Sequence, residues 1–150
     1  MSPLAAGEVA PRIPGVAFGA GPVGLFFYKV TCPTCQLAAA PTGAFETAYP
    51  GRVVGIGQDP PERLEAFARE YGMGLRAIAD LPPYPISDAY RIESVPTLFL
   101  VGEDGVNLES VGAWDRGGFN RVSRRIAELT GAEPLEISSP SDGLPSFRPG

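Results

Sequence analysis

The stretch YKVTCPTCQL, residues 28–37, contains both cysteines of this 150-residue chain. Cys32 and Cys35 are separated by two residues and lie between an apolar run and a run with helical spacing. Three functions compete for a pair with this spacing: half of a metal site, a structural disulfide, or a redox pair. The rest of the sequence decides between them.

The metal site and the structural disulfide both fit poorly. A structural zinc site takes four ligands, mostly Cys and His, and this chain has two cysteines and no histidine. A disulfide between Cys32 and Cys35 closes a loop too short to add much stability. The missing histidine also excludes Cys–His and Ser–His–Asp nucleophiles. We therefore expect no metal and no other cofactor.

A redox pair explains where the cysteines lie. Cys32 precedes Pro33, the expected first residue of a helix, so free N–H groups and the positive end of the helix dipole face its sulfur. Both features favour the thiolate, which is the nucleophile in thiol–disulfide exchange. Cys35 lies one turn further along and is shielded by the helix. We expect Cys32 to attack a partner disulfide and Cys35 to resolve the mixed disulfide.

The spacing of apolar residues predicts an α/β protein. The expected elements are a strand at 23–30, a helix from 33, a strand at 52–58, a helix opening at 60–61, a short strand at 75–80, a short helix at 86–92, a hairpin of 97–101 with 106–112, and a helix from 115 to 131. Asp59 is expected to cap the second helix. Because crossover helices demand parallel strands and the hairpin is antiparallel, we expect a mixed central β-sheet with helices on both faces.

Composition divides the chain into three parts. Residues 1–22 are rich in Gly, Pro and Ala and predict an irregular lead-in, while residues 23–131 form the folded domain. Residues 132–150 are rich in Pro and Ser and show no periodicity, which predicts a disordered tail.

Charge and hydropathy limit the partners. The net charge of −5 argues against nucleic acid, because phosphate binding needs an excess of Lys and Arg. The basic cluster of Arg121, Arg124 and Arg125 has the spacing of a solvated helix face. No apolar run is long enough to span a membrane, and the N-terminus lacks the pattern of a secretory signal. We expect a cytoplasmic monomer.

Four segments together resemble the thioredoxin superfamily, closest to its TlpA-like and thiol-peroxidase-like branch. They are GLFFYKVTCPTC (24–35), VVGIGQD (53–59), YRIESVPTLFLVGEDG (90–105) and the closing helix. The resemblance implies a thioredoxin fold with a cis Val95–Pro96 peptide bond facing the cysteines. It also implies that the backbone of Val95 pairs with the bound substrate chain. The other expected substrate contacts flank the nucleophile: Thr31, Pro33 and Thr34.

The resemblance has one departure that matters for the chemistry. Thioredoxin has a buried acid six positions before the first cysteine, where it moves protons for the second, and this chain has Phe26 there. Asp59, expected at the same edge of the sheet as Cys32, is the candidate proton relay.

The implied activity is thiol–disulfide exchange with a protein disulfide or a small thiol substrate, supported by an unidentified thiol reductant. Two alternatives stay open. One is a peroxiredoxin-like thiol peroxidase with Cys35 as the peroxidatic residue, and the other is a non-catalytic thioredoxin-like scaffold that binds a partner.

Overall fold

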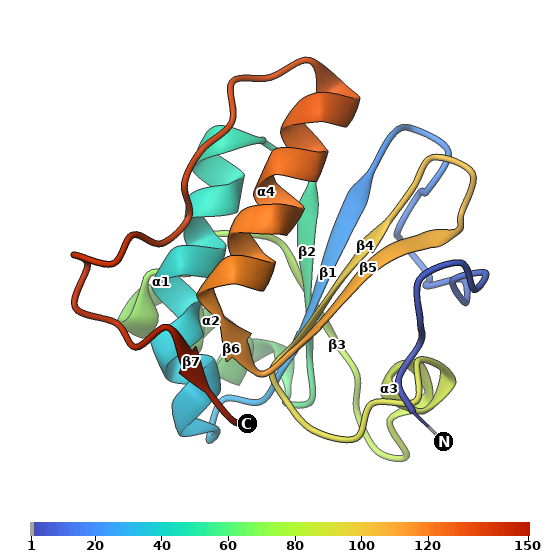
Figure 1. Cartoon of the computed structure of the whole chain (residues 1–150). Helices are drawn as coiled ribbons and strands as arrows, with labels where there is room; N and C mark the ends of the chain where they lie inside the picture. Colours follow the sequence, from blue (N-terminus) through green and yellow to red (C-terminus); the bar gives the residue numbers. More distant parts are fainter. Residues whose placement is uncertain (1) are drawn as a thin grey trace.

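The computed structural model describes residues 2–150 and contains a five-stranded sheet of order β3-β2-β1-β4-β5 (Figure 1). The elements of the domain are β1 (Val23–Tyr28), α1 (Pro33–Ala48), β2 (Val53–Gly57), α2 (Pro61–Tyr71), β3 (Ala77–Ala79), α3 (Pro85–Ala89), β4 (Thr97–Val101), β5 (Asn107–Gly112), β6 (Trp114–Asp115), α4 (Arg116–Thr130) and β7 (Phe147–Arg148). Each helix and strand expected from the apolar spacing is present, with boundaries shifted by a few residues.

The sheet is mixed, as the connections predicted. β1 is parallel to β2 and antiparallel to β4. Every residue of β1, β2 and β4 is buried, which is why these strands are continuous apolar runs without alternation. The parallel β1–α1–β2 connection places the start of α1 at the carboxyl end of the central strand.

Local residue chemistry sets the helix ends. Gly72 and Gly131 end α2 and α4 in the left-handed region, with φ of 74° and 72°, where a side chain is unfavourable. The side chain of Asp115 caps α4 by accepting from the N–H of Gly118 at 3.3 Å. The cap expected at Asp59 is wrong: the N-cap residue of α2 is Pro60, which has no side-chain cap.

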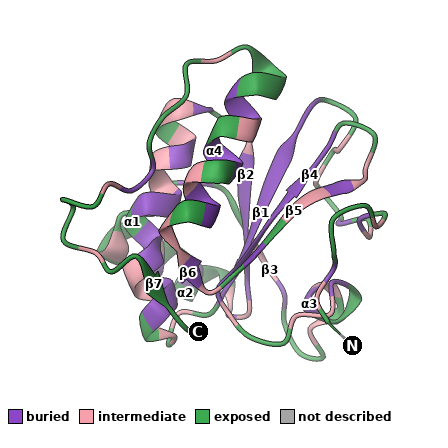
Figure 2. Ribbon diagram, viewed as in Figure 1, coloured by how far each residue is buried: buried purple, intermediate pink, exposed green. Residues whose placement is uncertain are grey.

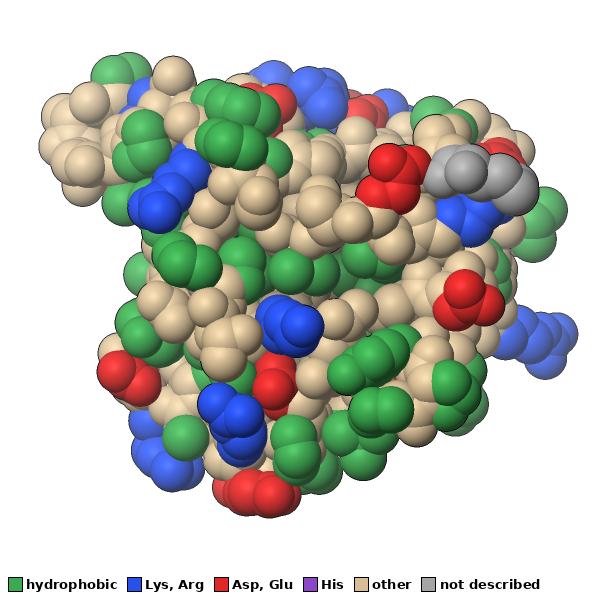
Figure 3. Space-filling model, turned by 90° about the horizontal axis from the view of Figure 1, so that it is seen from below, with side chains coloured by type: hydrophobic (Ala, Val, Ile, Leu, Met, Phe, Trp, Pro, Cys, Tyr) green, Lys and Arg blue, Asp and Glu red, His purple; other side chains and the backbone are tan. Residues whose placement is uncertain are grey.

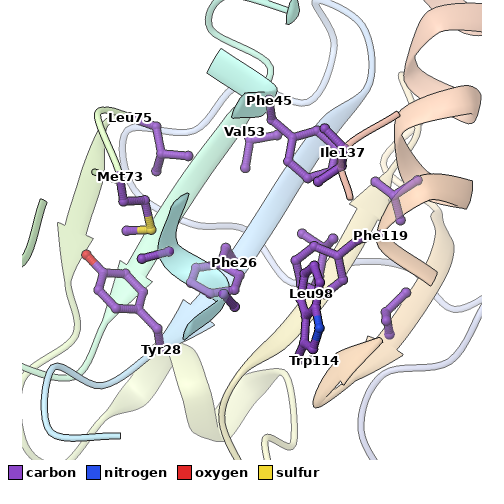
Figure 4. Close-up of a cluster of buried hydrophobic side chains, with 14 of the residues drawn as sticks. Phe26, Tyr28, Phe45, Val53, Met73, Leu75, Leu98, Trp114, Phe119 and Ile137 are labelled. Carbon is purple, nitrogen blue, oxygen red and sulfur yellow. The ribbon is translucent and has the colours of Figure 1, made fainter. Parts of the chain in front are cut away.

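Two hydrophobic clusters lie on opposite faces of the sheet. Helices α1, α2 and α4 cover the face that contains Phe26 and Leu98, and Phe119 of α4 packs into the same cluster (Figures 1 and 4). The other face, built on Phe27, is covered by the N-terminal lead-in and by the segment around α3. The lead-in is therefore irregular but packed, since Leu4, Ala10 and Ile13 are all buried.

Residues 132–150 differ from the disordered tail that their composition predicted. Ile137 and Ser138 are buried. The side chain of Asn120 accepts hydrogen bonds from the backbone N–H groups of both residues and donates one to the carbonyl of Ser138. The chain then returns along α4, and β7 pairs antiparallel with β6 (Figure 1). Polar contacts to α4 order this segment, and they leave no apolar periodicity in the sequence.

Among residues 2–150, no helix is both long enough and apolar enough to cross a membrane.

Candidate functional site

The two cysteines lie at the end of the sheet where β1 ends and α1 begins. This is the lower end of the molecule in Figure 1, and Figure 3 looks onto it. Charged side chains of both signs are scattered over this face, with hydrophobic and uncharged surface between them (Figure 3). A partner here would meet a mixed surface without a dominant charge.

Cys32 is the N-cap residue of α1, with an extended backbone at φ −82° and ψ 116°. Its Sγ accepts a hydrogen bond from the backbone N–H of Cys35 at 3.1 Å. The side chain is partly exposed, and both cysteines are free thiols. Negative charge on this sulfur is met by an N–H donor and by the positive end of the helix dipole. The geometry suits a nucleophile.

Cys35 is fully buried, in the same hydrophobic cluster as Ala38 and Ala39. Burial raises the pKa of its thiol, and the hydrogen bond with Cys32 raises it further. At neutral pH the Cys35 thiol is therefore protonated and out of reach of a bulky partner. It can react only with a group that is brought into the site, above all Cys32.

The loop before β4 brings a backbone carbonyl to the nucleophile. The peptide bond between Val95 and Pro96 is cis, and the carbonyl oxygen of Val95 accepts from Cys32 Sγ at 3.6 Å. Thr97, the first residue of β4, pairs with Phe27 of β1, so the central sheet fixes this loop opposite the start of α1.

Asp59 does not cap a helix but joins its own turn to the cysteine loop. Its Oδ2 accepts from the N–H of Val30 at 2.9 Å, and the residue is only 8% exposed. Arg63 on α2 approaches the other carboxylate oxygen at 3.8 Å. The β2–α2 turn is thereby tied to the residues just before Cys32.

Tyr28 lies beneath the same loop, and sequence reasoning missed it. Its hydroxyl is buried with no hydrogen-bond partner among residues 2–150. Burial is the main cause that raises the pKa of this phenol, and the negative charges of Asp59 and Cys35 raise it further. Phe26 lies in the same cluster, its ring stacked 5.5 Å from that of Tyr28 (Figure 4). The position that holds an acid in thioredoxin is therefore apolar here.

The remaining expected contacts divide by exposure. Thr31 and Pro33 are exposed beside the nucleophile, whereas Thr34 is buried. Thr34 Oγ1 donates to the carbonyl of Pro149 at 2.7 Å, so the end of the tail reaches the site. No motif in residues 132–150 signals this contact.

Comparison with known proteins identifies the fold. The thioredoxin domain of a thiol-disulfide oxidoreductase from Bacteroides vulgatus superposes with a TM-score of 0.68 at 19% identity, over 82% of this chain and 99% of that one. A thiol:disulfide interchange protein from a Bacteroides species gives 0.67 at 19% identity, over 82% and 91%. A thioredoxin family interchange protein from Chlorobium tepidum gives 0.64 at 16% identity, over 84% and 97%.

The chain therefore has the fold of the thioredoxin superfamily, as its motifs predicted. No protein-family model matches the sequence, and no curated protein matches it.

Proposed function

We propose that this protein is a thiol–disulfide oxidoreductase with Cys32 as nucleophile and Cys35 as resolving residue. One observation carries the proposal: a partly exposed Cys32 Sγ accepts from the N–H of Cys35 beside the Val95 carbonyl, with a buried thiol one turn behind it. The pair thus has one sulfur facing the solvent and one that is protected, which is the asymmetry that directed exchange needs. The structural neighbours, which are named for the same reaction, support the assignment.

The reaction proceeds in two exchanges. The Cys32 thiolate attacks one sulfur of a partner disulfide, the partner S–S bond breaks, and its second sulfur leaves as a thiolate that takes up a proton. Cys35 then loses its proton and attacks Cys32 Sγ, which releases the first partner sulfur as a thiolate. The partner gains two electrons, and the protein is left with a Cys32–Cys35 disulfide. An external dithiol or thiol reductant regenerates the reduced pair.

The second exchange is limited by deprotonation of Cys35. Burial raises its pKa, so a base must take its proton when the mixed disulfide forms. Asp59 is the proposed acceptor, because its carboxylate is held at the cysteine loop through Val30 and its charge acts on Tyr28 together with that of Cys35.

A thiol peroxidase based on Cys35 is disfavoured. A peroxidatic cysteine must be ionised and reachable by peroxide. Cys35 is fully buried, and burial raises the pKa of its thiol. A non-catalytic scaffold would have no use for the exposure of Cys32, and two of the three arginines of the basic cluster on α4, Arg121 and Arg125, are paired with Glu109.

The partner classes follow from the same site. One substrate is a protein disulfide or a small thiol, and the second is a thiol reductant. The chain is acidic and is not expected to bind nucleic acid. The monomeric state and the cytoplasmic location stay predictions. The compartment would decide whether the pair works as a reductant or an oxidant.

Reduction of insulin disulfides in the presence of dithiothreitol tests the roles. We expect Cys32→Ser to abolish turnover, whereas Cys35→Ser should accumulate mixed disulfides, detected by mass spectrometry. Undiminished reduction by both variants would refute the proposal, and mixed disulfides through Cys35 would reverse the roles.

A further inference from the structure

The segment that follows α4 ends on the functional site. Thr34, between the two cysteines, donates its hydroxyl to the carbonyl of Pro149 at 2.7 Å. At Gly150, an added Cβ atom would meet the carbonyl oxygen of Val95 and would lie 3.5 Å from the nitrogen of Pro96. The same Val95 carbonyl lies 3.6 Å from Cys32 Sγ. The chain therefore passes over the surface that a partner must reach in order to pair with the loop beside the nucleophile.

Residues 145–150, called the strap here, are held by a few polar contacts. Trp114 Nε1 donates to the carbonyl of Pro145 at 2.8 Å, and the N–H of Arg116 donates to that of Ser146 at 2.9 Å. Every residue of the strap is exposed, and its only strand is the short β7 (Figure 2). A two-stranded ribbon of this size is marginally stable by itself, so the strap can open without unfolding the domain.

The residues before the strap are held more firmly. Asn120 bonds the backbone at Ile137 and Ser138, and the guanidinium of Arg116 donates to the carbonyl of Leu144 at 2.7 Å. A strap that opens therefore stays tethered a few residues from the site, where its effective concentration is high. It competes with an incoming partner as an intramolecular ligand.

We propose that the strap occupies the position of an extended protein substrate, and that the substrates of this site are polypeptide segments that displace it. The inference rests on the proposed function and adds a substrate class and a control on access. A protein partner needs the Val95 backbone and the surface over Thr34, and the strap covers both. A small disulfide needs only the sulfur of Cys32, which remains partly exposed. The strap therefore slows exchange with proteins more than exchange with small disulfides.

The variant Gly150→Val tests this inference. Its side chain would collide with the Val95 carbonyl and push the end of the strap off the site. The matched control is Gly19→Val in the N-terminal lead-in, where an added Cβ meets no atom within 4 Å. Arg148→Pro removes the backbone N–H at the hydrogen-bonded Trp114–Arg148 pair of β6 and β7, and so releases the strap by an independent route.

The readout compares two substrates, insulin and glutathione disulfide. The loss of one hydrogen bond changes a local equilibrium by roughly two- to tenfold, so Gly150→Val and Arg148→Pro should each speed insulin reduction by about that factor. Rates with glutathione disulfide should stay within about twofold of the wild type, and Gly19→Val should match the wild type with both. An unchanged or slower insulin rate in both strap variants, or an equal gain with both substrates, overturns the inference.

Alkylation of Cys32 separates this inference from the proposed function. A protein that exchanges neither disulfide contradicts the function, but its strap can still be tested with small iodoacetamide and with a maleimide attached to a long peptide. If the strap covers the site, Gly150→Val accelerates only the peptide-linked reagent. Equal rates in wild type and variant would mean that the strap leaves the site open.

Discussion

The buried thiol of Cys35 should make the reduced protein lose stability in alkaline solution. An unfolded cysteine titrates near 9.0, whereas burial raises the pKa of Cys35 in the folded protein. Above 9.0 the unfolded chain releases a proton that the folded chain keeps. The folded state then binds more protons, so the free energy of unfolding falls as pH rises. Below 9.0 both states hold the proton, and the contribution is fully present.

The size of the loss follows from this difference. A group that titrates at 9.0 only in the unfolded state costs about 1.4 kcal/mol of stability by about pH 10 and less than about 0.1 kcal/mol by about pH 8. The side chain is fully buried, so solvent screening does not reduce this figure. Tyr28 and Tyr90 also have pKa values raised by burial, and both add to the loss only above their ordinary value of 10.0.

Urea unfolding of the reduced protein, followed by the fluorescence of Trp114, measures this loss at about pH 8 and at about pH 10. Cys35→Ala removes the titrating group, and its pH slope should be flatter by about 1.4 kcal/mol over this interval. Cys32→Ser is the matched control and should keep most of the slope, because burial is the first cause of the Cys35 shift. A slope that Cys35→Ala leaves unchanged would refute the assignment.

Two further predictions concern the groups behind the cysteines. Tyr28→Phe should leave the free energy of unfolding unchanged or raise it by up to about 1 kcal/mol, because the Tyr28 hydroxyl is buried without a hydrogen-bond partner in residues 2–150. Tyr90→Phe loses a 2.6 Å hydrogen bond to a backbone carbonyl and should lower the free energy of unfolding by about 1 kcal/mol, and urea titrations compare the two variants. Asp59→Asn keeps an oxygen for the hydrogen bond with the Val30 N–H but removes the negative charge. If the Asp59 carboxylate takes the proton of Cys35, the mixed disulfide should last about tenfold longer in this variant, as measured by quenched flow. An unchanged lifetime would exclude that role.

The sequence predicted the sheet because its three inner strands, β1, β2 and β4, are buried on both faces. A strand such as β1, with all six residues buried, must be a continuous apolar run, and such runs are visible without a structure. The redox pair was visible for a related reason: a proline at the first turn marks where α1 begins, and Cys32 precedes it. The helix cap was wrongly assigned to Asp59 because the sequence shows only neighbours along the chain, while its partner Val30 lies 29 positions away.

The tail could not be predicted because its contacts leave no pattern in composition. Its bonds join backbone groups to Trp114, Arg116 and Asn120, and backbone groups are the same in every residue. A Pro- and Ser-rich segment is expected to stay disordered because it lacks apolar area to bury. Here α4 supplies the polar partners that replace that area. The strap buries little apolar area of its own and is held by polar contacts. A hydropathy pattern therefore cannot predict that it is ordered, and for the same reason a substrate can displace it.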